Sequence, residues 1–592
     1  MGSTLWTAAI LPAVLLLTMT PNQTTGSLED RRHALDRLLD EHWQYSLREA
    51  PEFATIIGDY RYNDKVSDAS LAHVEQQRKD NEAFLKRFDA IDTTGFPEQE
   101  AINKQLMVRN LKESLESTAL KLYLMPVDQF NGVHLMLAQF VPLIPFDNAK
   151  HYEDYIARLH QIPHLLDQVT ATLEQGRRDH YMPPRFLLEK VVQQVQSIAE
   201  PSGEANVFGG PGKKFPEAIG EADQKRLREA LLKAVDTEVR PAYTKLANFV
   251  SKDYAQFGRT EAGLWSLPNG EALYRFAVKQ NTTTSMDPEA IHQLGLSEVA
   301  RIHKEMLTIA KSQGFADRKS FQDSLKTNSK VIPTSADDIL NTYRSYIAGM
   351  EPQLPKLFGL LPKTKVEVRP VQAYREKEAA AAEYNQGTPD GSRPGIVYVN
   401  TGDFAHRSKL SIESTSYHEA IPGHHMQIAI AQTLPGLPPF RQQAFYTAYV
   451  EGWALYAERL GKDIGFYKDP LSDYGRLSDE MLRACRLVLD TGVHYKHWTR
   501  EQMVSYFREN SGEDEPDIQA ETDRYIVMPG QALAYKIGQL KILELRERAK
   551  KELGAKYDIR AFHDEILNGG ALPLDVLEAR VATWMQAIKA QH

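Results

Sequence analysis

The chain has 592 residues, of which 42% are hydrophobic, and this is ample for a large folded core. Its 70 basic and 79 acidic residues give a net charge of −9, and no basic patch is interleaved with aromatic residues, so no nucleic-acid partner is expected. The only cysteine, Cys485, excludes an internal disulfide and lies in a helix-like run, where we expect a small core residue rather than a nucleophile.

The first 25 residues or so differ from the rest of the chain. Leu5 to Met19 is an almost uncharged apolar run, and a polar stretch follows from Thr20 to Ser27. The run suits the hydrophobic region of a signal peptide and is too short to span a membrane. We therefore predict a signal peptide in residues 1–25 and export to the periplasm or the exterior. An uncleaved anchor or a misassigned start codon is the alternative, and no other membrane span is predicted.

Residues 26–592 are predicted to form one large, mostly α-helical domain. Apolar residues recur at the three- and four-residue spacing of one helix face, and Pro and Gly separate the runs. No repeat of fixed period stands out, so a solenoid is not expected. The clearest helical patterns before the middle of the chain cover residues 29–46, 81–92, 98–121, 148–175, 184–199 and 223–258.

Residues 365–404 form the one predicted β region. Val366–Val371 and Ile396–Asn400 are short β-branched runs, and the turn-forming stretch Gly387–Gly391 lies between them. We predict a small hairpin or sheet that lies just before the next motif in the chain.

The densest cluster of metal-ligating side chains in the chain is His418-Glu419-Ala420-Ile421-Pro422-Gly423-His424-His425. A catalytic zinc site uses three His or carboxylate ligands, an open position for water and a base beside that water. In the familiar H-E-x-x-H motif, the two His lie one helical turn apart with the Glu between them. Here Glu419 follows the first His as required, but Pro422 occupies the position of the second.

A straight helix would serve neither of the remaining histidines. His424 would point well away from His418, whereas His425 would point almost the same way but lie roughly 10 Å further along the axis. Pro422 lacks a backbone N–H and crowds the preceding turn, and Gly423 tolerates dihedral angles that other residues avoid. We therefore predict a distorted helix that brings His424 to the metal and leaves His425 beside the ligands or in contact with substrate.

Glu451 is the candidate third ligand. It lies on the apolar, helix-like stretch from Ala448 to Leu460, where an ionised carboxylate is costly unless it is paired or bound to a metal. Glu458 lies two turns further along nearly the same face, so spacing does not decide between the two. The pattern predicts one Zn²⁺ held by His418, His424 and Glu451, with a merely structural cluster as the alternative.

The motif H-E-A-I-P-G-H-H-M-Q resembles the signature of the domain-of-unknown-function 885 family. These bacterial proteins look like distant relatives of the helical zinc peptidases, such as angiotensin-converting enzyme and thermostable carboxypeptidase. The resemblance covers nearly the whole mature chain and implies a gluzincin-like fold, mostly α, with a small β element beside the zinc helix. It is also carried by the blocks F-A-T-I-I-G-D from residue 53, R-P-G-I-V-Y-V-N from 393, E-G-W-A from 451, L-V-L-D-T-G-V-H from 487, R-Y-I-V-M-P-G-Q-A-L-A-Y-K from 524 and the segment 562–575.

The resemblance implies roles for residues outside the ligand set. In the helical peptidases a Tyr and a His steady the oxyanion, which points to Tyr535 and His494. A positive charge that binds a substrate carboxylate, as in a carboxypeptidase, would be Arg524 or Lys536. The strand beside the zinc binds extended substrate there, so residues 396–400, with Tyr398 as a contact, would add a substrate strand to the sheet.

The sequence therefore predicts a zinc-dependent metallopeptidase, an exopeptidase of carboxypeptidase-like action, in which Glu419 is the general base. A zinc amidohydrolase that acts on non-peptide amides or modified peptides is one alternative. A metal-binding protein that has lost catalysis is another, although ligation alone does not need Glu419.

Overall fold

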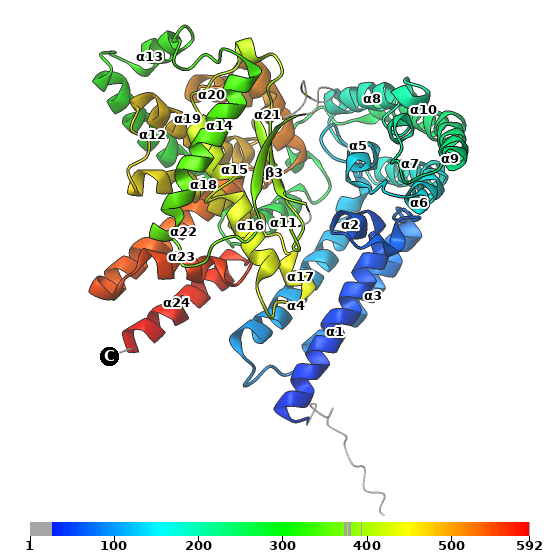
Figure 1. Ribbon diagram of the computed structural model, residues 1–592, viewed down its shortest axis with the longest axis horizontal. Coiled ribbons are helices and arrows are strands. Elements are labelled where there is room, and N and C mark those ends of the chain that lie inside the picture. The colour runs from blue at the N-terminus through cyan, green and yellow to red at the C-terminus, as the bar shows by residue number, and fades with distance from the viewer. Residues whose placement is uncertain (1–25, 372–375, 377–379, 392, 591–592) are drawn as a thin grey trace, which may run out of the picture.

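The computed structural model describes residues 26–371, 376, 380–391 and 393–590, and the chain is mostly helical with one small mixed sheet (Figure 1). The predicted signal peptide, residues 1–25, lies outside the described residues. Among the described helices, none is both long enough and apolar enough to cross a bilayer.

The helices that precede the sheet are α1 (Leu28–Glu49), α2 (Pro51–Ile56), α3 (Leu71–Asp89), α4 (Glu98–Ala119), α5 (Val133–Phe140), α6 (Ala149–Leu159), α7 (Ile162–Arg178), α8 (Arg185–Ala199), α9 (Glu221–Ala234), α10 (Arg240–Phe249), α11 (Gly270–Thr282), α12 (Pro288–Ser312), α13 (Arg318–Leu325) and α14 (Ala336–Met350). Of these helices, α1, α4, α6, α8 and α9 begin within two residues of a predicted start, whereas α3 begins ten residues before its predicted range and α2, α5 and α11 to α14 lie outside the predicted ranges.

The sheet and the helices that carry the metal motif follow. They are β1 (Val366–Pro370), β2 (Ala382–Asn385), β3 (Gly395–Val399), α15 (Ile412–Glu419), α16 (His424–Thr433), α17 (Pro439–Gln442), α18 (Thr447–Asp463), α19 (Pro470–His494), α20 (Arg500–Asn510), α21 (Glu515–Val527), α22 (Leu533–Leu553), α23 (Ile559–Leu567) and α24 (Leu574–Ala590).

The chain is arranged in two halves that lie side by side in Figure 1. Helices α1 to α10 form one half, in which α1, α3 and α4 are long rods and α5 to α10 curl into an arch. The other half contains the sheet and the helices from α12 onward. Buried contacts join the two halves. Arg441 of α17 donates to the Asn103 side chain of α4 at 2.7 Å. Ile102 and Leu106 of α4 also belong to the same hydrophobic core as α18 and α22.

The predicted small β element is a three-stranded sheet and not a hairpin, because its two predicted strands pair in parallel. β1 and β3 are parallel neighbours, with Val368 opposite Val397, and β2 pairs antiparallel with the other edge of β3. A parallel pair needs a long crossover, which the segment between them provides. Because β3 is the central strand and both of its edges are already paired, residues 396–400 cannot add a substrate strand, and that prediction is wrong too.

The sheet presents one face to the helices that lead into the metal motif. Val397 and Val399 pack in one cluster with Ile412 of α15 and with residues of α14. Successive side chains of a strand point to opposite faces, so Tyr398 lies on the face that α15 does not cover. Its predicted role as a substrate contact beside the metal helix is therefore not supported by its position.

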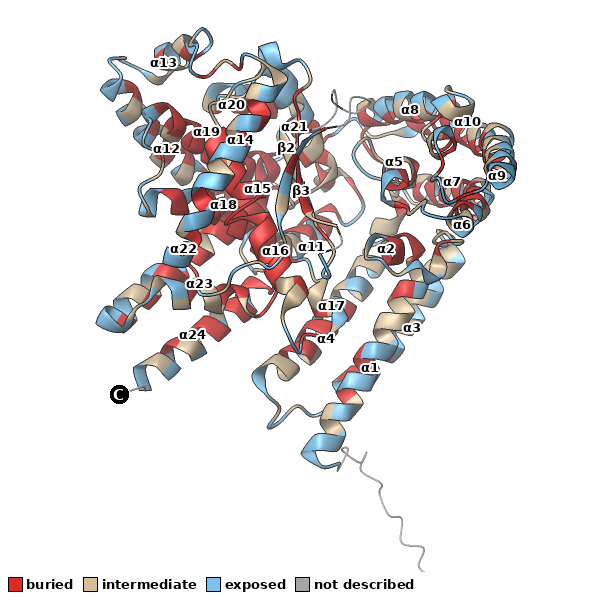
Figure 2. Ribbon diagram, in the orientation of Figure 1, coloured by how far each residue is buried: buried red, intermediate tan, exposed pale blue. Residues whose placement is uncertain are grey.

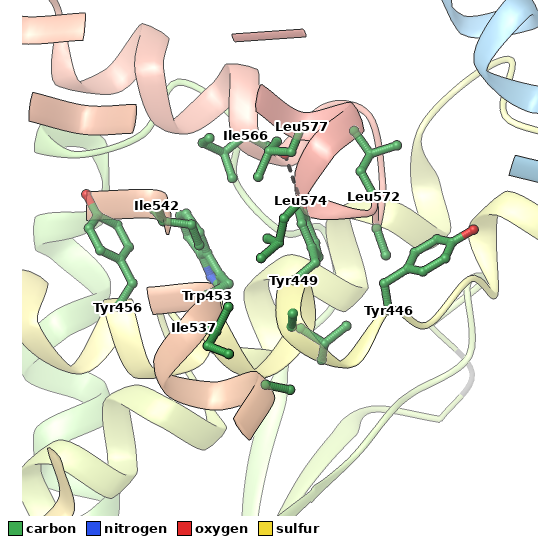
Figure 3. Close-up of a cluster of buried hydrophobic side chains, with 14 of the residues drawn as sticks. Tyr446, Tyr449, Trp453, Tyr456, Ile537, Ile542, Ile566, Leu572, Leu574 and Leu577 are labelled. Atoms are coloured by element: carbon green, nitrogen blue, oxygen red, sulfur yellow. Dashed lines mark hydrogen bonds between the residues drawn. The ribbon is translucent and has the colours of Figure 1, made fainter. Parts of the chain in front are cut away.

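Helix α18 runs through the middle of the larger core, and burial is concentrated in α15, α18 and α19 (Figure 2). Tyr449, Trp453 and Tyr456 of α18 pack among apolar side chains of α22, α23 and α24 (Figure 3). α18 and α22 approach each other most closely at Gly452 and Gly538, where a Cβ on Gly452 would lie 2.4 Å from the Gly538 Cα. Only glycine permits this contact, which holds the helix that carries Glu451 in place.

Candidate metal centre

The metal motif folds as two helices joined by a short turn. α15 ends at Glu419 and α16 begins at His424. Pro422 has no N–H to continue the helix, and a Cβ on Gly423 would lie 1.9 Å from the carbonyl oxygen of His418, so only glycine fits there. The Trp453 indole N–H donates to the carbonyl of Pro422 at 2.8 Å and ties the turn to α18. The predicted distortion is thus a complete break between two helices.

The turn brings His418, His424 and Glu451 together. One ligand atom from each lies within 4.8 Å of the others. Oε2 of Glu451 lies 3.6 Å from Nε2 of His418 and 3.4 Å from Nε2 of His424. Ligands at zinc-like bond lengths around a tetrahedral ion are separated by about 3.3–3.6 Å. The two distances to Glu451 therefore match such an ion, and the group as a whole could hold a metal, as the sequence predicts.

Nδ1 of His418 is engaged by a hydrogen bond, which leaves Nε2 as the nitrogen that can bind a metal. Nδ1 lies 2.8 Å from Oε1 of Glu458, and because a carboxylate only accepts, Nδ1–H donates. Nε2 is then the nitrogen that faces Glu451, and it can hold either a proton or a metal ion shared with that carboxylate. Glu451 is thus the candidate ligand and Glu458 the carboxylate that orients the imidazole, a choice that spacing left open.

His424 is positioned by a neighbour one turn along α16. Its Nδ1 lies 3.2 Å from Nε2 of Gln427, and the same amide donates to the carbonyl of Val450 at 2.8 Å. Gln427 therefore links the second histidine to the helix that supplies Glu451.

His425 points away from the ligand set. Its Nε2–H donates to the carbonyl of Thr364 at 3.0 Å, and its Nδ1 lies 3.0 Å from the Tyr384 hydroxyl, which therefore donates to it. Burial lowers the pKa of His425, in keeping with a neutral ring. With both nitrogens engaged, His425 joins α16 to β2 and is not a ligand.

The electrostatics of the centre favour a positive charge between the ligands. Burial alone would lower the pKa of His418, but the Glu451 and Glu458 carboxylates raise it to about 10. Burial alone would raise the pKa of Glu451, but the facing His424 and His418 hold it well below its usual range. Glu419, half-buried at the end of α15, has its pKa raised by burial, and the two histidines oppose that rise.

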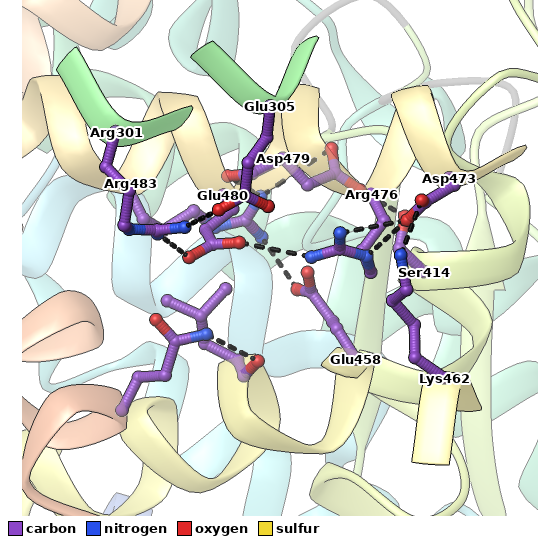
Figure 4. A network of polar contacts seen from close by, with 12 residues as sticks. Arg301, Glu305, Ser414, Glu458, Lys462, Asp473, Arg476, Asp479, Glu480 and Arg483 are labelled. Carbon is purple, nitrogen blue, oxygen red and sulfur yellow. Dashed lines mark hydrogen bonds and ion pairs between the residues drawn. The ribbon is translucent and has the colours of Figure 1, made fainter. Parts of the chain in front are cut away.

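Glu458 belongs to a network of charged and polar side chains from α15, α18 and α19 (Figure 4). Arg483 of α19 lies with Nη2 3.8 Å from Oε1 of Glu458 and with Nη1 3.7 Å from Asp479. Ser414 of α15 donates to Asp479 at 2.5 Å. Burial raises the pKa of Asp479 to about 6, against the effect of Arg483. The network joins α15, α18 and α19 and so fixes the helix that carries His418.

Lys536 belongs to the structural core, which corrects its predicted role in substrate binding. The side chain is fully buried. Its ammonium lies 2.7 Å from Glu480, 2.9 Å from Glu298 and 2.8 Å from the Gln539 side-chain oxygen. Its three N–H groups are used by these partners, so none remains for a ligand.

His494 is likewise a buried hydrogen-bonded residue, which corrects its predicted role at the oxyanion. The Leu264 N–H donates to its Nδ1 at 3.1 Å, so the proton is on Nε2, which donates to the carbonyl of Tyr525 at 2.9 Å. Burial lowers its pKa to about 3. Neither nitrogen is left for a substrate.

Arg524 of α21 contacts Tyr535, which lies in the first turn of α22. Nη2 of Arg524 lies 3.4 Å from the Tyr535 hydroxyl. Tyr535 precedes Gly538 by about one turn, and Gly538 touches Gly452, the residue after Glu451. The beginnings of α18 and α22 are therefore neighbours, which keeps Tyr535 as a candidate beside the metal centre.

Several site residues were missed from the sequence: Gln427, Trp453 and Arg483. A signal existed for Arg483, because it interrupts the apolar stretch of α19, where an unpaired charge would be costly. Gln427 also follows His424 by one turn and shares its face. The contact between Trp453 and the turn has no local signature, because the partners lie on different helices.

The comparisons with known proteins agree with this fold. A crystal structure of a candidate lipoprotein from Colwellia psychrerythraea is 30% identical, covers 94% of this chain and 99% of its own, and superposes with a TM-score of 0.89. A candidate lipoprotein of unknown function from Shewanella oneidensis, 18% identical over the same shares of the two chains, has a TM-score of 0.71 and shows the same fold. No curated protein matches. A family model described as a bacterial protein of unknown function, DUF885, matches residues 51–581, and the chain therefore belongs to that family.

Proposed function

We propose that this protein is a zinc-dependent peptidase in which Glu419 acts as the general base. The observation that carries the proposal is the convergence of His418, His424 and Glu451, whose ligand atoms lie within 4.8 Å of one another, with both histidines 3.4–3.6 Å from Glu451. The glutamate that follows His418 adds a second carboxylate that ligation itself does not need.

The chemistry follows from the residues around the centre. When bound, Zn²⁺ supplies a Lewis acid that lowers the pKa of a neighbouring water toward about 7. Glu419 would take the proton from a water beside the ligand set as that water attacks the scissile carbonyl, and would then deliver the proton to the leaving amine. The Tyr535 hydroxyl, held beside Arg524, donates to the oxyanion that forms on the carbonyl. Glu458 keeps the His418 ring in the orientation that this geometry needs.

Export of the protein is part of the proposal. It is supported by the apolar run from Leu5 to Met19 and by the description of the two similar structures as candidate lipoproteins. A peptidase on that side of the membrane would meet peptides released outside the cytoplasm.

The test compares the wild type with Glu419→Gln. Both proteins are incubated with a mixed peptide library after their zinc content has been measured, and products are read by mass spectrometry. We expect cleavage by the wild type and a loss of about 10²–10⁴-fold in the variant, with zinc retained in both. Glu547→Gln, on the exposed face of α22, is the matched control and should cleave as the wild type does.

Two results would overturn the proposal. Equal activity of Glu419→Gln would reject Glu419 as the base. Intact peptides with zinc present in both proteins would reject a peptidase, and a panel of non-peptide amides would then separate an amidohydrolase from a catalytically silent metal site.

A further inference from the structure

A cavity of about 650 Å³ lies where the two halves of the chain meet. Residues of α1, α3 and α4 form one wall, and the end of α11, α17 and the segment that leads into α18 form the other. The Tyr446 hydroxyl donates to Oδ1 of Asn110 at 3.1 Å and so joins the two walls. Cavities of this size are typical of sites that hold a small molecule or a short stretch of another chain.

One side of the cavity adjoins the helix that supplies Glu451. Thr447, which lines the cavity, is the first residue of α18 and precedes Glu451 by one turn, about 6 Å along the axis. Asn281, which also lines the cavity, contacts the Thr447 hydroxyl and the carbonyl of Pro529, each at 3.4 Å. Because an extended peptide rises about 3.3–3.6 Å per residue, the cavity begins about two to four residues of substrate away from the ligand set.

Aromatic rings line both walls of the cavity. Trp43 and Tyr45 of α1 belong to one wall, and Phe440, Phe445 and Tyr446 belong to the other. Phe445 is 62% exposed, which is the largest value among the large hydrophobic side chains of the described residues. Exposed apolar surface that lines a cavity marks a place where a ligand can bury it. The rings therefore offer an apolar partner a surface on which to pack.

The charges around the cavity favour an uncharged partner. All of its lining residues are described, and none of them is a lysine or an arginine. Burial lowers the pKa of His42 to about 4, so this lining ring is neutral at neutral pH. Of the two lining carboxylates, Glu49 pairs with Arg48 at 3.2 Å. Glu113 pairs with Arg109 at 3.0 Å. An acidic ligand would meet these two carboxylates without a free cation, and a basic ligand would find both already paired.

Two amide side chains complete the lining. Gln77 of α3 and Gln280 of α11 make no hydrogen bond with another described residue. A carboxamide carries an N–H donor and a C=O acceptor, the same two groups that a peptide unit carries. The cavity thus offers rings for an apolar side chain and amides for the backbone beside it.

We propose that this cavity is a substrate subsite that takes a bulky, uncharged side chain, with Trp43 and Phe445 as its main contacts. The proposal rests on the proposed peptidase function and names its substrate class. This class is peptides with a large apolar or aromatic residue about two to four residues from the bond that is cut. Such a side chain buries its surface against the rings, whereas an acidic side chain at the same position is rejected.

The first test measures side-chain preference by position. The bond that the wild type cuts is identified in one peptide, and the four residues on either side of it are replaced in turn by Phe, Gln or Glu. We expect one position, two to four residues from the bond, at which Phe exceeds Glu by about 10- to 100-fold in kcat/KM. Phe445→Ala should lose most of this preference, and Phe445→Tyr, which keeps the ring, should retain it. Phe257→Ala removes another exposed ring, outside the cavity, and should keep the preference.

A binding measurement separates this proposal from the proposed function. N-acetyl-glycyl-phenylalanyl-glycinamide and its glutamyl analogue are titrated into the metal-free full chain by calorimetry, so that neither hydrolysis nor metal ligation contributes. We expect the wild type to bind the phenylalanyl peptide about tenfold more tightly or better, and Phe445→Ala to show little difference. Selective binding that depends on Phe445, with no peptide cleaved, would keep the subsite and reject the peptidase. Cleavage without selectivity, or a preference that survives in Phe445→Ala, would reject the subsite alone.

Discussion

Nδ1 of His418 lies 2.8 Å from Oε1 of Glu458, and both side chains are buried. Glu458 and Glu451 lie two turns apart on α18, so both carboxylates project from nearly the same face of that helix toward the His418 ring. One carboxylate lies at Nδ1 and the other beside Nε2. The first fixes which nitrogen carries the proton, and the second completes the group of facing ligand atoms.

Loss of the Glu458 carboxylate should weaken metal binding without removing a ligand. In Glu458→Gln the ring of His418 loses its charged acceptor, and the apparent metal affinity should fall about 10- to 100-fold. Metal titration against a competing chelator measures this. Glu547→Gln, an exposed glutamate of α22, should bind as the wild type does, and an unchanged affinity in Glu458→Gln would show that the carboxylate does not orient the ring.

Substitution of the two adjacent histidines of the motif should have different effects on the zinc content of the protein. His424→Ala removes a candidate ligand, so the purified protein should contain little zinc. His425→Ala removes the link between Thr364 and Tyr384, so it should lower the melting temperature and keep the zinc. Elemental analysis of both variants checks the assignment, and zinc lost from His425→Ala alone would reverse it.

The contact between α18 and α22 should tolerate no side chain. A Cβ on Gly452 would lie 2.4 Å from the Gly538 Cα, so Gly452→Ala must push the helices apart. We expect a loss of about 1–3 kcal/mol in the free energy of unfolding, measured with urea, and weaker metal binding as Glu451 shifts.

Gly349 of α14 provides the matched control for that substitution. A Cβ there would meet only Phe466, at 3.7 Å, so Gly349→Ala should be neutral or stabilise the helix by up to about 1 kcal/mol. Equal losses in both variants would mean that the close approach at Gly452 is not the cause.

Asp490 should make the stability depend on pH. It accepts hydrogen bonds from the Tyr274 hydroxyl at 2.7 Å and from the Gly530 N–H at 2.9 Å, and burial raises its pKa from 3.8 to about 7. Between these two values the folded state holds a proton that the unfolded state has released, so stability is lost as the pH rises through this window.

The variant Asp490→Asn cannot titrate at this position. Its free energy of unfolding should therefore rise relative to that of the wild type by up to about 1 kcal/mol per pH unit between pH 5 and 7. Urea unfolding at several pH values measures the difference. Parallel profiles for the two proteins would show that Asp490 is charged at neutral pH in the folded state.

The sequence by itself determined the helical class, the His and Glu residues of the candidate metal site and the break in the helix between His418 and His424. These follow from local physics: apolar residues at helical spacing predict helices, and Pro422 and Gly423 act on the backbone where they stand. The predicted helix around Glu451 coincides with α18 for the same reason.

Only the tertiary structure decided between residues of the same type. Glu451 and Glu458 have nearly the same helical phase, and His418 distinguishes them because it meets one at Nε2 and the other at Nδ1. The sequence predicts that Lys536 binds substrate, but its ammonium is paired with Glu298, which lies more than 200 residues earlier in the chain. The same holds for His494, paired with Leu264. A buried polar group is defined by its partners, and these partners come from segments far apart in the sequence, which no local pattern records.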